Sequence, residues 1–190
     1  MRALVVYESM YGNTHLIAAQ IGDGLRSHCS VDVVPAFRVT HDQVANADLV
    51  VVGGPTHAHG MSRRATRRAA AEAANKPSSG LELDIDAMSP GLREWFDEVG
   101  DHEHALAAAF DTRVDMPRAL SGSACRGIER RLRRHGFEIV AEPESFFVDK
   151  HNRLRGDQVQ RAFTWGEALA ESAAHRTVPT DGIAALSHRS

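Results

Sequence analysis

Short apolar runs alternate with stretches of helical periodicity along almost the whole chain, and this alternation limits the possible folds more than any other feature. Residues 3–7 are continuously apolar, as in a strand that is covered on both faces. Residues 13–28 then place apolar side chains such as Ile17 and Ile21 on one helical face. The same change of period predicts further strands at 31–35, 47–52, 105–110 and 137–148, the last interrupted at Pro143, and further helices at 62–74, 90–99, 124–134 and 159–170.

Strands that alternate with helices are joined by right-handed crossovers, which make the sheet mostly parallel. The sequence therefore predicts an α/β fold, a doubly wound five-stranded parallel sheet with helices on both faces, in one domain over residues 1–173. Residues 174–190 show no sustained period and are expected to form a loosely ordered C-terminal tail. Ligands of such sheets bind beyond the carboxyl ends of the strands, where the strand order reverses. The loops after the first, third and fourth strands are therefore the candidates.

The composition narrows the classes of function. Lys and Arg number 22 against 25 Asp and Glu, which leaves a formal net charge of −3 and gives no reason to expect a nucleic-acid partner. No apolar run approaches the roughly 20 residues that a membrane-spanning helix needs, so no membrane insertion is expected. Two cysteines are too few for a disulfide framework and favour a reducing compartment. We expect a cytoplasmic protein, and the sequence leaves its oligomeric state open.

The sequence lacks the residues that three other functions of a doubly wound sheet require. A phospho-receiver needs acidic residues after the first strand and an aspartate after the third, but the chain offers only Glu8 and then Gly53-Gly54. A serine hydrolase needs a nucleophile elbow, and Gly122-Ser123 lacks the flanking residues. The glycine-rich dinucleotide motif is also absent after the first strand.

The loop after the first strand has the residues of a phosphate site. Ser9 and Thr14 carry hydroxyl donors, Gly12 allows a close backbone approach, and a helix begins just beyond. The first N–H groups of a helix lack internal partners, and its dipole favours an anion. Plain capping of the helix by Asn13 or Thr14 is the alternative interpretation.

At this point the sequence resembles a known family. Ser9-x-x-Gly12-Asn13-Thr14, between a first strand and a first helix, resembles the FMN phosphate loop of the flavodoxins, with Tyr11 where a threonine is usual. The resemblance spans roughly residues 2–169. Further similar segments, in the same order, are 48–56, 110–113, 122–124 and 144–148.

The resemblance implies an FMN cofactor and the strand order 2-1-3-4-5 of a flavodoxin-like sheet. One departure is that neither loop expected to flank the flavin ring contains Trp or Tyr, the residues that usually sandwich it. The flavin would then be more exposed and open to a substrate. Residues implied to hold the phosphate are Ser9, Met10, Tyr11, Gly12, Asn13 and Thr14; those implied to flank the ring are Pro55, Thr56, His57, Ala58, His59 and Gly60 on one side and Thr112 and Arg113 on the other.

Several side chains near these loops have more than one interpretation. His57 and His59 could hydrogen-bond the flavin or move protons, could ligate a metal, or could be solvated loop residues. The basic cluster Arg63, Arg64, Arg67 and Arg68 could attract an anionic partner, but a solvated helix face is the simpler reading.

Arg113 and Cys125 also allow two interpretations each. Arg113 could stabilise a reduced, anionic flavin or form a surface salt bridge with Asp111 or Asp115. Cys125 lies in a first helical turn, where the dipole lowers the pKa of a thiol, although a packed and inert cysteine is the commoner case.

The resemblance predicts an FMN-binding redox protein that works either as an electron carrier or as a small flavin-dependent reductase, in the second case a quinone-reductase-like NAD(P)H oxidoreductase. Its partners would be a redox protein in the first case and NAD(P)H with a small acceptor in the second. The alternative is a degenerate module of the same fold that binds a partner and no flavin, for which Tyr11 and the missing aromatics are the best support.

Overall fold

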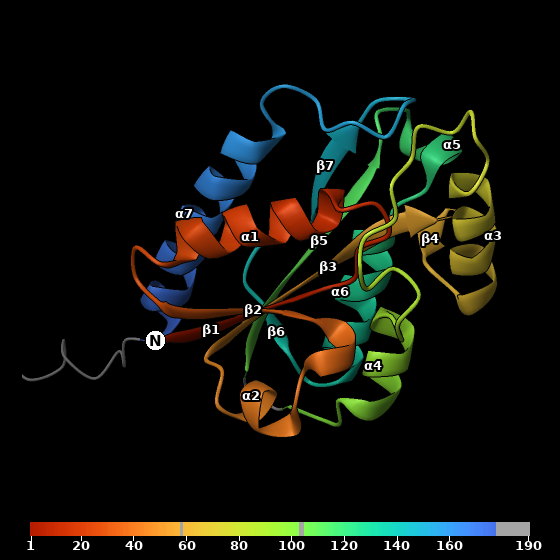
Figure 1. The fold of residues 1–190 in the computed structure, drawn as a ribbon. Coiled ribbons are helices and arrows are strands. Elements are labelled where there is room, and N and C mark those ends of the chain that lie inside the picture. Colours follow the sequence, from red (N-terminus) through yellow and green to blue (C-terminus); the bar gives the residue numbers. More distant parts are fainter. Residues whose placement is uncertain (58, 103–104, 178–190) are drawn as a thin grey trace, which may run out of the picture.

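The computed structural model describes residues 1–57, 59–102 and 105–177. A central parallel sheet has the order β2-β1-β3-β5, and β6 and β7 both pair with the outer side of β5 (Figure 1). The strands are β1 (Arg2–Tyr7), β2 (Ser30–Pro35), β3 (Leu49–His57), β4 (Gly60–Met61), β5 (Leu106–Val114), β6 (Glu138–Ile139) and β7 (Glu144–Val148).

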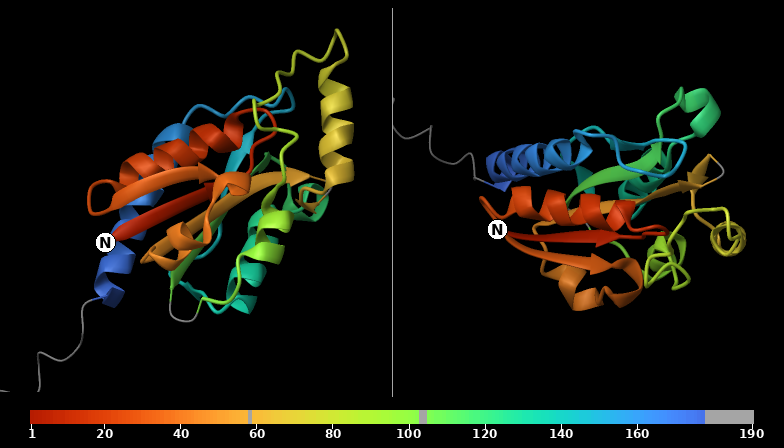
Figure 2. Two further views of the ribbon diagram at one scale, coloured as in Figure 1. Left: turned by 60° about the horizontal axis from the view of Figure 1, so that its bottom comes forward. Right: turned by 45° about the horizontal axis from the view of Figure 1, so that its top comes forward.

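Helices cover both faces of this sheet (Figures 1 and 2). Helices α1 and α7 pack against each other on one face, and α2, α4 and α6 lie on the other. Helix α3 stands beside these layers, near the carboxyl ends of the strands. The helices are α1 (Asn13–Leu25), η1 (Ala36–Arg38), α2 (His41–Ala45), α3 (Arg64–Ala74), α4 (Leu92–Glu98), α5 (Arg118–Ser121), α6 (Ala124–Arg134) and α7 (Gln158–Thr177).

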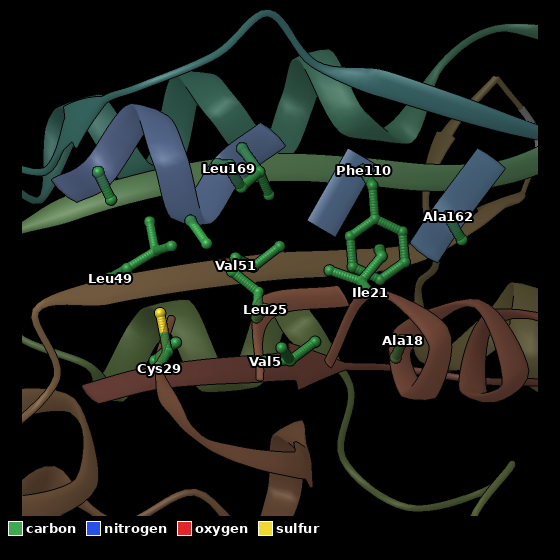
Figure 3. Close-up of a cluster of buried hydrophobic side chains, with 14 of the residues drawn as sticks. Val5, Ala18, Ile21, Leu25, Cys29, Leu49, Val51, Phe110, Ala162 and Leu169 are labelled. Carbon is green, nitrogen blue, oxygen red and sulfur yellow. The ribbon is translucent and has the colours of Figure 1, made fainter. Parts of the chain in front are cut away.

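The apolar strands divide the core into two layers, because successive side chains of a strand point to opposite faces. Val5 and Val51 meet Ile21 of α1 and Leu169 of α7 on one face (Figure 3). Val6, Val50 and Val52 meet Phe96, Ile128 and Leu132 on the other. The continuous apolar runs are therefore continuous because both faces are buried.

The predicted order 2-1-3-4-5 is confirmed, with β5 as the fourth strand. The fifth strand is split into β6 and β7, as Pro143 predicted, and both halves pair with β5. The short elements η1, α2, β4 and α5 were not predicted, since each is too brief to show a period.

The C-terminal boundary lies later than predicted. Helix α7 continues to Thr177, four residues into the segment expected to be a loose tail, because its alanine-rich end keeps helix propensity. The rest of that expected tail, residues 178–190, lies outside the described residues. No helix among the described residues is long and apolar enough to cross a membrane.

Candidate functional site

Three loops meet at the carboxyl edge of the sheet, at the point where the strand order reverses. Strands β1 and β5 lie on either side of β3, so residues after Tyr7, Pro55 and Thr112 become neighbours. Tyr7 is in register with Gly53, and Pro55 is in register with Thr112. The two strands flanking β3 lead to helices on opposite faces of the sheet, and ligands of doubly wound sheets bind at such a place.

The N-terminus of α1 carries no side-chain cap. Its N-cap is Gly12, which adopts a left-handed conformation at φ +83°, and no acidic residue lies in the first turn. A Cβ at Gly12 would meet no atom within 4 Å, so there is open space over the loop. The Ser9 hydroxyl accepts a hydrogen bond of 3.1 Å from the Gly12 N–H. The free N–H groups of this turn therefore face a space without a negative charge from their own helix.

Asn13 and Thr14 do not cap α1, although capping was the alternative interpretation. The Asn13 amide donates a hydrogen bond of 2.8 Å to the Asn152 carbonyl, in the loop between β7 and α7. The Thr14 hydroxyl shares a hydrogen bond of 2.7 Å with the hydroxyl of Thr112. Both threonines are buried, so this bond links the first and third loops inside the protein.

Met10 and Tyr11 anchor the same loop on its other side. Met10 is buried, and its carbonyl accepts a hydrogen bond of 2.9 Å from the Asp84 N–H. The Tyr11 hydroxyl donates to the Ala70 carbonyl of α3 at 3.0 Å. The unusual residue of the motif thus ties the loop to α3. Asp84 also approaches this turn, with its carboxylate 3.6 Å from the His15 ring.

In the second loop, the hydroxyl of Thr56 is already engaged in hydrogen bonds within the protein. The Thr56 hydroxyl donates to the Asp111 carboxylate at 3.0 Å and accepts a hydrogen bond of 2.9 Å from the Ala124 N–H. The same carboxylate oxygen accepts from the Cys125 N–H at 2.9 Å and from the Ser123 hydroxyl at 3.2 Å. Thr56 and Asp111 therefore satisfy the N-terminus of α6, and sequence reasoning missed this role of Asp111.

His57 is half-buried at the end of β3. Burial lowers the pKa of its imidazole, the nearby Arg67 guanidinium lowers it further, and the Glu8 carboxylate opposes both effects. The ring is accordingly neutral at pH 7 and has one donor and one acceptor nitrogen. The described residues hold no group of three or more His, Cys, Asp or Glu side chains that could bind a metal ion.

His59 is exposed and lies against the start of α6, while Ala58 lies outside the described residues. The Ser123 N–H donates to the His59 carbonyl at 3.3 Å. Gly122 makes this approach possible: it has φ +74°, and a Cβ there would lie 2.1 Å from the His59 Cα. The segment from His59 to Gly60 is thereby fixed to α6, with open space around Gly60.

Arg113 points away from the solvent and forms neither of the expected salt bridges. It is 7 % exposed and donates hydrogen bonds to the Met116 carbonyl at 2.8 Å and the Ser121 hydroxyl at 2.7 Å. Its guanidinium lies over the Phe147 ring, 4.7 Å from the centroid. The buried Nε has no hydrogen-bond partner among the described residues. Arg113 therefore braces the segment that leads from β5 to α5.

One further expectation, for Arg67, needs correction, and the structure decides between the two interpretations of Cys125. Arg67 of the basic cluster is only 3 % exposed and pairs with Glu94 at 2.8 Å and Glu8 at 3.8 Å, so it is not part of a solvated face; Arg63, Arg64 and Arg68 are exposed. Cys125 is fully buried, and burial, with the Asp111 carboxylate as a second cause, raises the pKa of its thiol to about 11. The inert, packed interpretation of Cys125 is the one that the structure supports.

The donors at the first loop suit a phosphate group. The loop combines an uncapped helix start, the buried hydroxyls of Ser9 and Thr14, and open space over Gly12. A phosphate dianion needs several donors and a positive dipole, and a helix N-terminus supplies both. The residues present are therefore compatible with the phosphate of FMN. The ring-flanking segments offer imidazole, hydroxyl and backbone groups in place of aromatic ones.

The fold and the site define a doubly wound α/β protein with a candidate anion-binding loop at the switch point of its sheet. A model of the flavodoxin family matches residues 5–109, more than half of the chain. The chain therefore belongs to the flavodoxin family, whose members bind FMN and transfer electrons. Comparison with curated protein sequences gave no match.

Solved structures support the same fold. A flavodoxin from the domain Archaea superposes with a TM-score of 0.62 at 20 % identity, over 92 % of this chain and 100 % of the other. Flavodoxin 1 from Bacillus cereus gives 0.63 at 16 % identity, over 94 % and 100 %. Rubredoxin oxygen:oxidoreductase from Desulfovibrio gigas gives 0.60 at 16 % identity, over 94 % of this chain but 37 % of that larger protein.

Proposed function

We propose that residues 9–14 hold the FMN phosphate and that this chain is a redox protein whose flavin accepts and passes on electrons. The observation that carries the proposal is the N-terminus of α1, which has no side-chain cap and no acid in its first turn. When bound, FMN supplies the one- and two-electron chemistry. The chain supplies the donors: hydroxyls at Ser9 and Thr14 and the N–H groups that follow Gly12.

The residues expected to surround the flavin ring favour electron exchange with a small molecule over electron exchange with a protein alone. The segment from Pro55 to Gly60 and the pair Thr112 and Arg113 contain no Trp or Tyr, so no large aromatic side chain from them covers a flavin. A neutral His57 offers a ligand one hydrogen-bond donor and one hydrogen-bond acceptor. We therefore place the small flavin-dependent reductase first and the protein-to-protein electron carrier second.

The experiment is a titration of the purified chain with FMN, followed by visible absorption and fluorescence, with riboflavin as the ligand that lacks the phosphate. We expect saturable FMN binding and much weaker riboflavin binding. Consumption of NADPH or NADH in the presence of a quinone then separates a reductase from a carrier. If neither flavin binds, the chain is a degenerate module and the proposal fails.

Thr14→Ala is expected to weaken FMN binding by about 1.5–3 kcal/mol, because a hydrogen bond to a charged group is lost. The variant also leaves the Thr112 hydroxyl without its partner, so its folding must be checked by circular dichroism. Ser9→Ala tests the same site through the other hydroxyl and leaves the Gly12 N–H without its acceptor, so its folding is checked in the same way. Thr164→Ala, on the exposed side of α7, is the matched control. Unchanged FMN affinity in both site variants would remove these hydroxyls from the phosphate site.

A further inference from the structure

A cavity of about 690 Å³ lies beside the expected flavin loop, and arginine dominates its lining. Three helices contribute to it: α4, α5 and α6. Among the described residues that line it, none is acidic. Its arginines are Arg93, Arg118, Arg126, Arg130, Arg131 and Arg134.

The arginines gather on one side of α6. Arg126, Arg130 and Arg134 recur every fourth residue and so form one stripe along the helix. Arg133 lies off this stripe and pairs with Glu129 at 2.8 Å. Glu129 is the one acidic residue of α6, and it is therefore occupied away from the cavity. No residue of α6 itself therefore neutralises the stripe of Arg126, Arg130 and Arg134.

Most of these charges are not neutralised by the protein. Among the described residues, Arg118, Arg126, Arg130 and Arg134 have no carboxylate partner. Arg131 has only Asp97 at 3.7 Å. Arg93 donates to two backbone carbonyls, with the Ser62 oxygen at 2.8 Å, and burial together with Arg131 and Arg63 lowers its pKa. The whole chain has a net charge of −3, so this concentration is local and does not reflect a basic protein.

A solvated helix face does not account for the arrangement. Solubility of α6 would explain its own arginines, but not the convergence of Arg93 from α4 and Arg118 from α5 on the same hollow. Like charges held together repel, and a concave site lined by one sign focuses its field on an ion of the opposite sign. The charge of the lining therefore suits an anionic ligand.

We propose that this cavity binds the phosphate groups of a soluble nucleotide. Guanidinium groups match phosphate oxygens bidentately, and the volume lies in the range of small-molecule sites. An acidic protein segment suits it less, because the part of the lining that the structure describes has no Trp, Tyr or Phe to serve as the buried anchor of a protein interface.

The position of the cavity gives such a ligand a use. His59, Gly60 and Met61 line it, and the first two belong to the segment expected to flank the flavin ring. A nucleotide held by the arginines of α6 therefore extends toward this segment. The interpretation as an electron donor to FMN rests on the proposed function, whereas phosphate binding by the arginines does not.

The test is calorimetric titration of the full chain, with and without FMN, using NADPH, NADH, ADP and ATP, and with adenosine as the uncharged control. We expect saturable binding that strengthens with the number of phosphates and weakens with salt, and no binding of adenosine. Tighter binding of NADPH or NADH than of ADP and ATP would indicate a hydride donor. The opposite preference would indicate an adenine nucleotide with another role. Absence of binding by all four nucleotides overturns the proposal, as does binding of a polyglutamate peptide in their place.

The location is tested by variants of α6. The double variant Arg130→Gln/Arg134→Gln should weaken nucleotide binding at least tenfold and leave FMN binding unchanged. Arg133→Gln removes the same charge from the same helix outside the cavity and should change nucleotide binding less than twofold. Equal losses of nucleotide affinity in the double variant and in Arg133→Gln would place the nucleotide site outside the cavity. If the wild-type chain binds the nucleotides but not FMN, only the proposed function is contradicted.

Discussion

The N-termini of α1 and α6 stand in comparable places and are used in opposite ways. Each follows the carboxyl end of a central strand, α1 after β1 and α6 after β5 through the short α5. At α6, the Thr56 hydroxyl and the Asp111 carboxylate accept hydrogen bonds from the first N–H groups. At α1, no side chain does so and no acid lies in the first turn.

The difference shows what decides whether a helix start is available to a ligand. Both helices offer orphan N–H groups and a positive dipole end. The chain fills one with its own buried carboxylate, Asp111, and leaves the other to hydroxyls that carry no charge. A helix N-terminus is therefore a candidate anion site only where the protein does not supply the anion itself.

Removing the internal anion should have the largest effect. Asp111→Ala takes the acceptor from three donors, of which the Cys125 N–H is buried, and we expect the free energy of unfolding to fall by at least about 3 kcal/mol. Urea unfolding measures this. Asp115→Ala removes an exposed carboxylate paired with Arg155 and should change it by less than about 1 kcal/mol. A similar small change in both variants would mean that α6 does not depend on Asp111.

Adding an internal anion to α1 should make the two helix starts alike. Ser9→Asp places a carboxylate beside the Gly12 N–H, where it competes with a phosphate for the same donors. We expect FMN affinity to fall by about 1.5–3 kcal/mol, roughly 10- to 150-fold. Ser27→Asp, beyond the other end of α1, carries the same charge and should bind FMN like the wild type. Retained affinity in Ser9→Asp would exclude this loop as the phosphate site.

The link between the two loops should have a smaller effect on stability. Thr112→Val removes the hydroxyl that bonds Thr14 at 2.7 Å but keeps the shape of the side chain. We expect a loss of about 1 kcal/mol in the free energy of unfolding, because one buried hydroxyl loses its partner. Thr164→Val on the exposed side of α7 should be close to neutral. A larger loss in the control would show that the valine itself, and not the lost bond, is responsible.

The thiol of Cys125 reports on the α6 terminus through its titration. Its pKa in the folded protein is about 11, above the ordinary value of 9.0, so only the unfolded state ionises between these values. The stability present below pH 9 is therefore partly lost as the pH rises from 9 to 11. Cys125→Ser should flatten this loss in denaturant unfolding. A slope unchanged by the substitution would assign the loss to another group.

The sheet and its loops could be predicted because they depend on local patterns. The apolar run at 3–7 and the periodicity at 13–28 identify β1 and α1 without knowledge of their neighbours. The position of Gly12 between them identifies the turn. The meeting of three loops then follows from the topology of a doubly wound sheet.

The pairing of side chains could not be predicted, since it depends on residues far apart in the sequence. Arg67 resembles Arg63 and Arg64 in its local sequence. In the fold, however, it is buried and forms ion pairs with Glu8 and Glu94, which are distant in the sequence. Arg93, Arg118 and Arg130 show no common pattern until the fold brings α4, α5 and α6 together. Asp111 was noticed only as a possible partner of Arg113, because nothing nearby in the sequence indicates that it serves α6.

The hydrogen bond between Thr14 and Thr112 can form only after most of the chain has been synthesised. The two residues are 98 positions apart, and the bond closes a loop that includes β2, β3 and α4. Contacts of such long range form late, since the entropy of loop closure must be overcome first. The first loop of a nascent chain therefore lacks this contact until β5 has been made, and a chain cut off before Thr112 would never form the bond between the two loops.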